Sequence, residues 1–279
     1  ASMPGMIWGK VLRSPHARAR IINIDASKAA AASSVFAVVT AADFPDLPAD
    51  DYIGERVIAR GRVTYEGQAI AAVAASSAHE AEEALHLIDV EYEVLPHVLD
   101  VVEAMKPETV LVQEDLLTDG ADPPADKPSN IAKRVEFGHG DVERGFADAD
   151  LIVEREFNTR PVHQGYIEPH TCLVKADDAG KVDVWAGNKS PHPGKRMVAV
   201  AIGLSPEDVV FNPVTIGGDF GGKGSAMDIP IAWMLSVKTG RPIKIVFDYS
   251  EDLTSANPRH ASRVTMKTGV KRDGTIVAH

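Results

Sequence analysis

The sequence has only one cysteine, Cys172, among its 279 residues. A single thiol cannot form an internal disulfide, and it cannot by itself hold a zinc ion or an iron-sulfur cluster. No apolar run reaches the roughly 20 residues that a membrane helix needs, and no basic, apolar signal segment opens the chain. These absences favour a cytoplasmic protein without a membrane span.

Basic residues are scarce relative to acidic ones, with 29 against 40 and a formal charge of -11. This negative charge repels phosphate backbones and argues against general nucleic-acid binding. Hydrophobic residues make up 44% of the chain, which is ample for a sizeable core. The composition is that of an ordinary globular protein of one large or two ordinary domains.

Short apolar runs separated by turns organise the first third of the chain. Ser27 is placed to cap a short Ala-rich helix, and Ser77 to cap a helix over residues 78 to 87, with Glu80 positioned for a capping box. Residues 43 to 55 carry two prolines and predict a surface loop. Strands are predicted at residues 6 to 12, 19 to 24, 35 to 39, 69 to 75 and 88 to 94.

Prolines become frequent after residue 95, which predicts a linker over residues 98 to 130 with one helical patch near residues 101 to 105. Regular patterns resume at residue 131. Strands are predicted there at 131 to 137, 151 to 158, 182 to 185, 243 to 247 and 262 to 270, and helices at 140 to 147, 193 to 202 and 226 to 235. The sequence thus predicts an α/β (α+β) protein with regions 1–97 and 131–279.

The stretch from residue 209 to 235 is the one around which the chain is organised. A β-branched run enters it, four glycines follow within six positions, and a helical pattern leaves it. Glycine removes the Cβ that would keep a ligand away from the main chain, and the amides of a following helix point into that space. The pattern indicates a cradle for an anionic or oxo-bearing cofactor, formed by Gly217, Gly218, Asp219, Phe220, Gly221 and Gly222.

Two other interpretations of this loop compete. In a tight turn the glycines would only relieve crowding, but each costs roughly 0.5–1 kcal/mol of backbone entropy, which favours a further reason for two Gly-Gly pairs. A nucleotide P-loop fits residues 217 to 223 and then fails, because Gly224 stands where a hydroxyl should hold magnesium. Asp219 would also place a negative charge among the amides meant for phosphate.

Four motifs fall in the order typical of one family. The loop at residues 217 to 223 is similar to a G-G-x-F-G-G-K loop, and residues 12 to 21 and 66 to 73 resemble two signatures of an α/β hammerhead domain. Glu168-Pro169 and Asn257-Pro258-Arg259-His260 complete the pattern. Together these stretches resemble the molybdopterin-binding subunit of the xanthine dehydrogenase and aldehyde oxidase family.

The resemblance implies a hammerhead domain over residues 1–97, followed by the first part of a molybdopterin-binding domain. It implies a molybdenum hydroxylase that oxidises an aldehyde or N-heterocycle with oxygen from water. The implied cofactor is molybdenum on molybdopterin, as the cytosine dinucleotide or a similar form, with no metal ligand assigned to the protein. [2Fe-2S] clusters and FAD are expected only on partner subunits, because each cluster needs about four ligands.

Two positions depart from the family pattern. Lys189 stands where the family usually has a glutamine that reaches an oxo ligand of the molybdenum, so it is a candidate cofactor contact. An ammonium group can still donate there, but it changes the polarity of the site. Gly224 replaces a glutamate that contacts substrate in xanthine-type members, which argues against a purine substrate.

The segment from His163 to His170 gathers polar residues around Glu168. Two histidines and a carboxylate could bind zinc, but their spacing matches no helical pair and Pro169 interrupts the segment. A structural role near the cofactor loop is the preferred interpretation.

The family's general base is a glutamate in a later motif, so no catalytic residue is assigned in this chain. The hairpin cut after His279, and the strand that begins almost at residue 1, predict that the chain works with a second chain or a continuation that completes the molybdenum domain. A small molecule is the expected substrate. The alternative is a non-catalytic assembly or structural subunit without cofactor, in which the glycine loop serves only packing.

Overall fold

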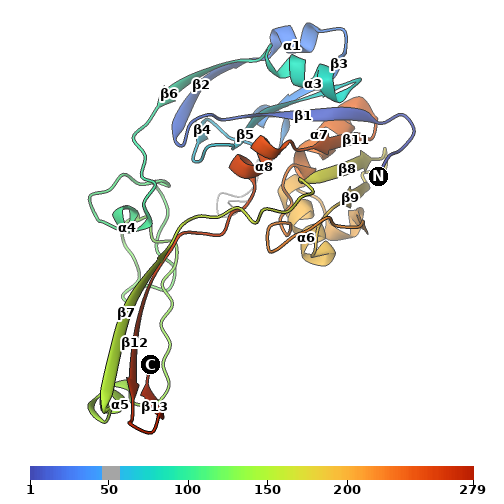
Figure 1. Cartoon of the computed structure of the whole chain (residues 1–279). Coiled ribbons are helices and arrows are strands. Elements are labelled where there is room, and N and C mark those ends of the chain that lie inside the picture. The colour runs from blue at the N-terminus through green and yellow to red at the C-terminus, as the bar shows by residue number, and fades with distance from the viewer. Residues whose placement is uncertain (46–56) are drawn as a thin grey trace. The chain divides into compact units, whose positions relative to one another are not determined.

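The structure is a computed structural model that describes residues 1–45 and 57–279 (Figure 1). Most of the surface loop predicted for residues 43 to 55 lies outside the described residues. The chain forms two compact units: the first contains Ala1–Leu95 and His163–Pro258, and the second contains Pro96–Val162 and Arg259–His279. The predicted domain boundaries follow sequence motifs, whereas these units follow contacts, so the boundaries stay a prediction.

A seven-stranded sheet forms the centre of the first unit (Figure 1). Its strands are β1 (Ile7–Arg13), β3 (Val35–Thr40), β5 (Ala69–Ala75), β8 (Thr171–Ala176), β9 (Val182–Ala186), β10 (Val209–Pro213) and β11 (Ile243–Val246). Their order in the sheet is β10-β9-β8-β11-β1-β5-β3, and β1 pairs parallel with β11 and antiparallel with β5. Segments far apart in the sequence therefore share one sheet.

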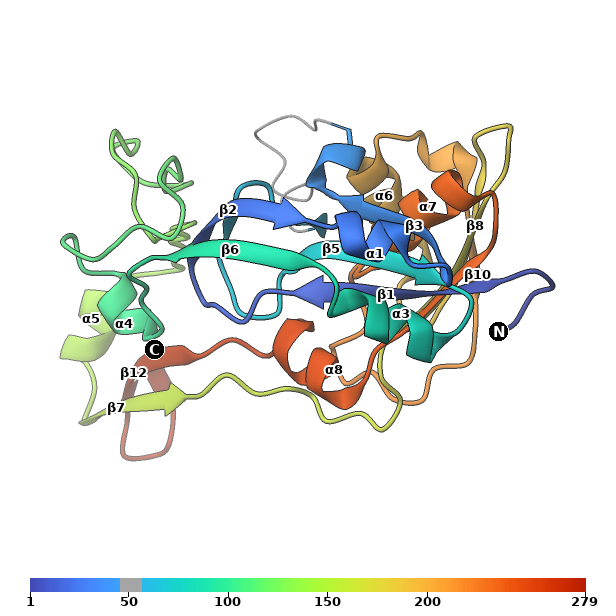
Figure 2. The ribbon, with the colours of Figure 1, turned by 90° about the horizontal axis from the view of Figure 1, so that it is seen from above.

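Helices and a smaller sheet accompany this sheet in the first unit. They are α1 (Ser27–Ala31), α3 (Ala78–Leu85), α6 (Pro191–Ile202), α7 (Ile229–Thr239), β2 (Ala19–Asp25), β4 (Arg62–Val63) and β6 (Asp89–Val94). Helix α3 contacts β1 and β5, and α7 contacts β8, β11, β5 and β3. The smaller sheet has the order β4-β2-β6, and Figure 2 shows β2 and β6 running side by side.

Strand β5 shows why the larger sheet is buried on both faces. All seven of its residues are apolar and buried. Ala72 and Ala74 belong to the larger core cluster with residues of α6 and α7, whereas Ala71 and Val73 belong to a cluster with residues of α1 and α3. Successive side chains of a strand point to opposite faces, so helices are needed on both sides. The buried strand predicted from this apolar run is confirmed.

Two predicted helix caps have different outcomes. Ser77 is the N-cap of α3, and its hydroxyl accepts a hydrogen bond from the Glu80 amide at 3.2 Å, as predicted. The cap predicted for Ser27 is wrong, because Ser27 is already inside α1. Its amide donates instead to the Asp25 carboxylate at 3.0 Å.

The second unit contains a three-stranded antiparallel sheet. Its elements are α4 (Val101–Ala104), α5 (Val142–Ala147), β7 (Leu151–Thr159), β12 (Ser262–Val270) and β13 (Ile276–Ala278), with the strand order β13-β12-β7. The strand predicted at residues 131 to 137 is wrong, because that stretch has only an isolated bridge between Asp119 and Lys133. Val135 and Phe137 are 69% and 94% exposed, so their apolar alternation has no surface to pack on.

Three further short elements complete the described chain. They are the 3-10 helices η1 (Ala41–Asp43) and η2 (Pro206–Asp208) and the helix α8 (Tyr249–Ser255). Across residues 1–45 and 57–279, no helix is both long enough and apolar enough to cross a membrane.

Candidate functional site

The glycine loop, residues 214 to 228, connects β10 to α7. Helix α7 begins at Ile229, three residues later than predicted, because Met227 has a φ of 42° and Asp228 takes the N-cap position. A positive φ is incompatible with a right-handed helix. Gly218 and Gly221 have φ values of 100° and 97°, which only glycine adopts without strain.

The glycine loop packs directly on the segment from Gln164 to Glu168. A Cβ on Gly222 would lie 2.7 Å from Tyr166 Cε1, and one on Gly218 would lie 2.9 Å from Tyr166 Cβ. A Cβ on Gly217 would lie 2.6 Å from Glu168 Cβ. Three of the four glycines between residues 217 and 222 are therefore required by close packing. Gly221 differs, since a Cβ there would meet nothing within 4 Å.

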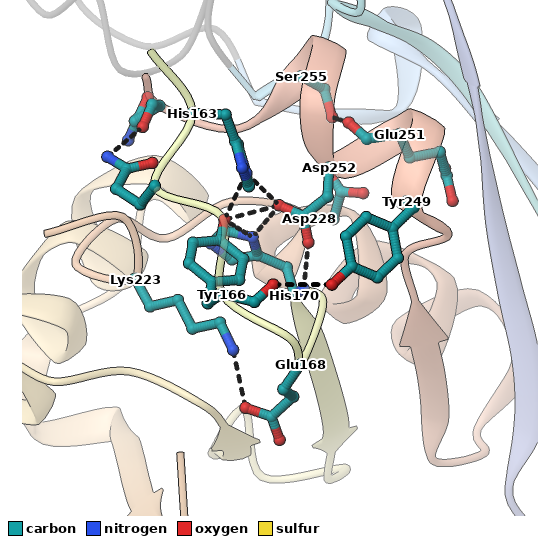
Figure 3. A network of polar contacts seen from close by, with 12 residues as sticks. His163, Tyr166, Glu168, His170, Lys223, Asp228, Tyr249, Glu251, Asp252 and Ser255 are labelled. Carbon is teal, nitrogen blue, oxygen red and sulfur yellow. Dashed lines mark hydrogen bonds and ion pairs between the residues drawn. The ribbon is translucent and has the colours of Figure 1, made fainter. Parts of the chain in front are cut away.

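An ion pair between a buried lysine and a partly exposed glutamate supports the loop (Figure 3). The Lys223 side chain is 1% exposed, and its Nζ lies 2.7 Å from Glu168 Oε2 and 4.6 Å from the centre of the Tyr166 ring. Glu168 also accepts the Gly217 amide at 2.7 Å. Burial acts to raise the pKa of Glu168, but Lys223 and this amide outweigh it and hold the pKa below its ordinary value. Lys223 therefore has no free ammonium for a phosphate, as a P-loop would need.

Asp219 holds the turn of the loop together. Its carboxylate accepts the amides of Gly221 at 2.8 Å and of Lys223 at 2.6 Å, and Lys189 Nζ lies 3.4 Å from Oδ2. Burial acts to raise the pKa of Asp219, but these amides and the charge of Lys189 lower it. The structure thus brings Lys189, from the turn before α6, to the predicted loop, with its side chain 44% exposed.

Some polar groups of the loop have no partner in the protein, and their chemistry suits an oxo-bearing or anionic cofactor. Within the part of the chain that the structure describes, the amides of Gly218 and Asp219 donate to no acceptor, and the buried Ser225 Oγ has no partner. Unused amides and a nearby ammonium favour oxo or phosphate oxygens. Among the described residues no group of three or more His, Cys, Asp or Glu is arranged to hold a metal ion.

A buried hydrogen-bond network lies beneath the loop (Figure 3). Asp252, on α8, accepts the Tyr166 hydroxyl at 2.7 Å and lies 2.8 Å from His170 Nδ1, and it also accepts the His170 amide at 2.6 Å. His163 Nε2 lies 3.4 Å from the same carboxylate. Burial acts to raise the pKa of Asp252, but the bonds from His170 and Tyr166 outweigh it and lower the pKa to about 2. This ordered network gives the segment a structural role beside the glycine loop.

The exit of the loop is tied to β1 by an ion pair. Arg13 Nη2 lies 2.6 Å from Asp228 Oδ2, and its guanidinium stacks on the Phe247 ring at 4.6 Å. Arg13 also contacts Glu251 at 3.2 Å. Beside this pair, a cavity with about 20 Å³ of room is lined by His170, Ser225 and other residues, which is space for about one water. His170 Nε2 is buried there without a protein partner.

Two family models cover nearly the whole chain. Residues 124–279 match the molybdopterin cofactor-binding domain, and residues 1–96 match the aldehyde oxidase and xanthine dehydrogenase a/b hammerhead domain. These two domain matches place the chain in the class of molybdopterin-binding proteins. The chain belongs to the aldehyde oxidase and xanthine dehydrogenase family. The predicted family, fold class and molybdopterin cofactor are confirmed.

Curated relatives agree with this assignment. The chain is 34% identical over 280 residues to a probable xanthine dehydrogenase subunit of Bacillus subtilis, covering 100% of this chain and 36% of that protein. It is 33% identical over 289 residues to the carbon monoxide dehydrogenase large chain of Afipia carboxidovorans, covering 99% of this chain and 35% of that protein. The chain therefore spans about a third of the length of these relatives.

Solved structures show the same fold. The reconstituted CO dehydrogenase from Oligotropha carboxidovorans aligns with a TM-score of 0.84 at 30% identity, over 99% of this chain and 35% of that chain. The aldehyde oxidoreductase from Desulfovibrio gigas aligns with a TM-score of 0.81 at 24% identity, over 98% of this chain and 30% of that chain.

Proposed function

We propose that this chain forms part of a molybdenum hydroxylase that oxidises an aldehyde or N-heterocycle. In that reaction a substrate C–H bond and water give a C–OH group, two protons and two electrons, and the electrons pass to partner iron-sulfur and flavin subunits. The molybdenum cofactor supplies the redox chemistry when bound, whereas the protein supplies position and hydrogen bonds. One curated relative is a probable xanthine dehydrogenase subunit and the other is a carbon monoxide dehydrogenase large chain, so both relatives support an oxidoreductase and the first supports an N-heterocycle as substrate.

The observation that carries the proposal is a set of unused hydrogen-bond donors on a loop that is held by its own hydrogen bonds. The Gly218 and Asp219 amides have no protein acceptor among the described residues, and the Lys189 ammonium lies at the same turn. Their supports are already paired, because Glu168 binds Lys223 and Asp219 binds two loop amides. Pre-positioned donors stabilise charge on a ligand without reorganising when it binds.

The remaining loop residues have complementary roles in this proposal. Gly217 and Gly222 allow the loop to approach its support, and Gly221 leaves an open surface for the cofactor. Phe220 is 63% exposed and would shield the bound group from water. A Cβ on Gly224 would lie 3.3 Å from Lys189 Cε, so the lysine stem occupies the space beside it. No side chain at residue 224 can hydrogen-bond a substrate, which argues against purines.

The assembly and location are part of the same proposal. A second chain or a continuation completes the molybdenum domain, in keeping with the third of the relatives' length that is covered. The [2Fe-2S] clusters and any FAD belong to partner subunits, because one buried cysteine cannot hold a cluster. A cytoplasmic location is proposed for the assembly.

Metal and pterin analysis of the purified protein, with its co-purifying chains, tests the function. We expect close to stoichiometric molybdenum and pterin, together with oxidation of small aldehydes or N-heterocycles by a dye acceptor. A folded assembly that contains neither molybdenum nor pterin, even when expressed with abundant molybdate, would instead establish the non-catalytic subunit.

A further inference from the structure

We propose that Tyr166 and Asp252 are a positioning pair that fixes the shape of the glycine loop (Figure 3). The loop's importance for the cofactor rests on the function proposed above, but the positioning itself does not. Neither residue touches the outer surface of the loop, since Tyr166 is 1% exposed and the Asp252 side chain is 1% exposed.

The ring of Tyr166 is the surface on which the loop rests. A methyl group on Gly222 would lie 2.7 Å from ring atom Cε1, and one on Gly218 would lie 2.9 Å from Tyr166 Cβ, where the ring is attached. Between these two contacts the loop carries its unused amides and the turn held by Asp219. Lys223 places its ammonium over the same ring at 4.6 Å. A tilt of the ring would therefore displace the Gly222 and Lys223 end of the turn relative to the Gly218 end.

The hydroxyl of Tyr166 prevents that tilt. It donates to Asp252 at 2.7 Å, and Asp252 is itself held by the amide and ring of His170. Burial raises the pKa of Tyr166 well above its ordinary value, so the phenol stays neutral and remains a donor. Asp252 belongs to α8, whose first turn is fixed by a capping box of Asp248 and Glu251. The loop is thus positioned by a residue 86 positions from Tyr166 and on another element.

Removing the Tyr166 hydroxyl distinguishes a positioning role from simple filling of space. Tyr166→Phe retains the ring, so Gly218 and Gly222 keep their packing, but it leaves Asp252 short of a donor. Loss of a buried hydrogen bond to a charged group is destabilising, because the carboxylate is left with an unmet acceptor. If the pair positions the loop, that cost appears as local opening of residues 217 to 223 and not as uniform loosening of the fold.

The experiment compares Tyr166→Phe with Tyr92→Phe in the intact holoenzyme. Tyr92, on β6, also loses a phenol hydroxyl but contacts His16, away from the loop. Three quantities are measured: amide hydrogen exchange along the chain, molybdenum content, and the electron paramagnetic resonance spectrum of the reduced molybdenum. For Tyr166→Phe we expect exchange over residues 217 to 223 to rise about tenfold or more, with lower molybdenum content and an altered spectrum.

The outcomes separate the two proposals. Unchanged exchange in the loop, or an equal rise throughout the chain, would overturn the positioning role. Faster exchange confined to the loop, with molybdenum content and spectrum unchanged, would keep the positioning role and count against the cofactor contact. If Tyr166→Phe does not fold, Asp252→Asn replaces it, since a carboxamide has one acceptor oxygen for the donors that the carboxylate takes on two. Exchange over residues 217 to 223 is then expected to rise more than exchange elsewhere in the first unit.

Discussion

At the scale of single residues, Lys189 is the charged side chain of the proposed site, at a position where the resemblance leads us to expect a glutamine. Its Nζ lies 3.4 Å from Asp219, so its side chain is directed by the loop itself. The resemblance was enough to predict that Lys189 faces the cofactor, because the motif around it is a short continuous stretch just before α6. It could not indicate the pairing with Asp219, which depends on how two distant turns meet.

Lys189→Gln should retain the cofactor and change the pH dependence of kcat/KM, because a neutral amide still donates but carries no charge. Lys189→Ala should lower kcat/KM further, since it removes the donor as well. Molybdenum content and kcat/KM between pH 5 and 10 are the measurements. Wild-type profiles for both variants would mean that the ammonium has no part in the reaction.

Asp252 should make the stability of the protein sensitive to acid. Its pKa is lowered to about 2 in the folded protein, so its stabilisation is complete above its unfolded pKa of 3.8 and is lost as pH falls toward about 2. The shift corresponds to about 2 kcal/mol. Asp252→Asn should therefore lower the free energy of unfolding at pH 7, and the difference from wild type should shrink below pH 4.

Urea unfolding at several pH values measures this difference, and Asp178→Asn, in an exposed turn, is the control. A deficit that stays constant from pH 7 to pH 3 would show that the carboxylate charge is not what Asp252 contributes.

At the scale of elements, the glycine loop combines two requirements that sequence alone could not separate. The order of strand, loop and helix was predictable from the apolar patterns around the glycines. The sequence could not show which glycines serve packing, because Gly217, Gly218 and Gly222 contact residues about 50 positions earlier in the chain. The start of α7 was predicted too early for a similar reason, since a methionine in the sequence does not indicate a positive φ.

Gly221→Val should reduce cofactor occupancy more than it reduces thermal stability. Its Cβ would meet nothing in the protein, so the structural cost is the strain of a positive φ, about 1–2 kcal/mol. Gly180→Val, in the turn between β8 and β9, is a matched control with a φ of 83° and equally open surroundings. Equal losses of melting temperature with molybdenum lost only in Gly221→Val are expected; unchanged molybdenum there would count against the loop.

Removing only one partner of the ion pair between Glu168 and Lys223 should destabilise the protein more than removing both. Glu168→Gln leaves the buried Lys223 ammonium without its counter-charge, for which we expect a loss of about 3 kcal/mol. The double variant Glu168→Gln with Lys223→Met should recover part of this stability, because no buried charge remains. Chemical denaturation of the three proteins compares them, and additive losses would show that the two residues are not coupled.

At the scale of the whole molecule, the first unit is made from two stretches separated in sequence by most of the second unit. Family motifs could predict the order of the parts, but not that β1 pairs with β11. Periodicity identifies a strand without identifying its neighbours, since any two buried strands offer similar apolar faces. For this reason the elements were largely predictable and the sheet order was not.

Cleavage of the chain between residues 97 and 161 should leave the first unit intact. Its two stretches share one sheet and the ion pair between Arg13 and Asp228, so the fragments should remain together after a single cut. Limited proteolysis followed by size-exclusion chromatography, with and without urea, is the measurement. Fragments that separate without urea would show that the shared sheet does not hold the unit together.

The parallel pairing of β1 with β11 also has a consequence in time. Strand β1 ends at Arg13, whereas β11 begins at Ile243, so during synthesis the first strand leaves the ribosome long before its neighbour exists. Contacts between such distant segments form slowly. One edge of β1 therefore stays unpaired while most of this chain is made. Until residue 246 has emerged, the nascent protein needs another segment or a chaperone to cover that edge.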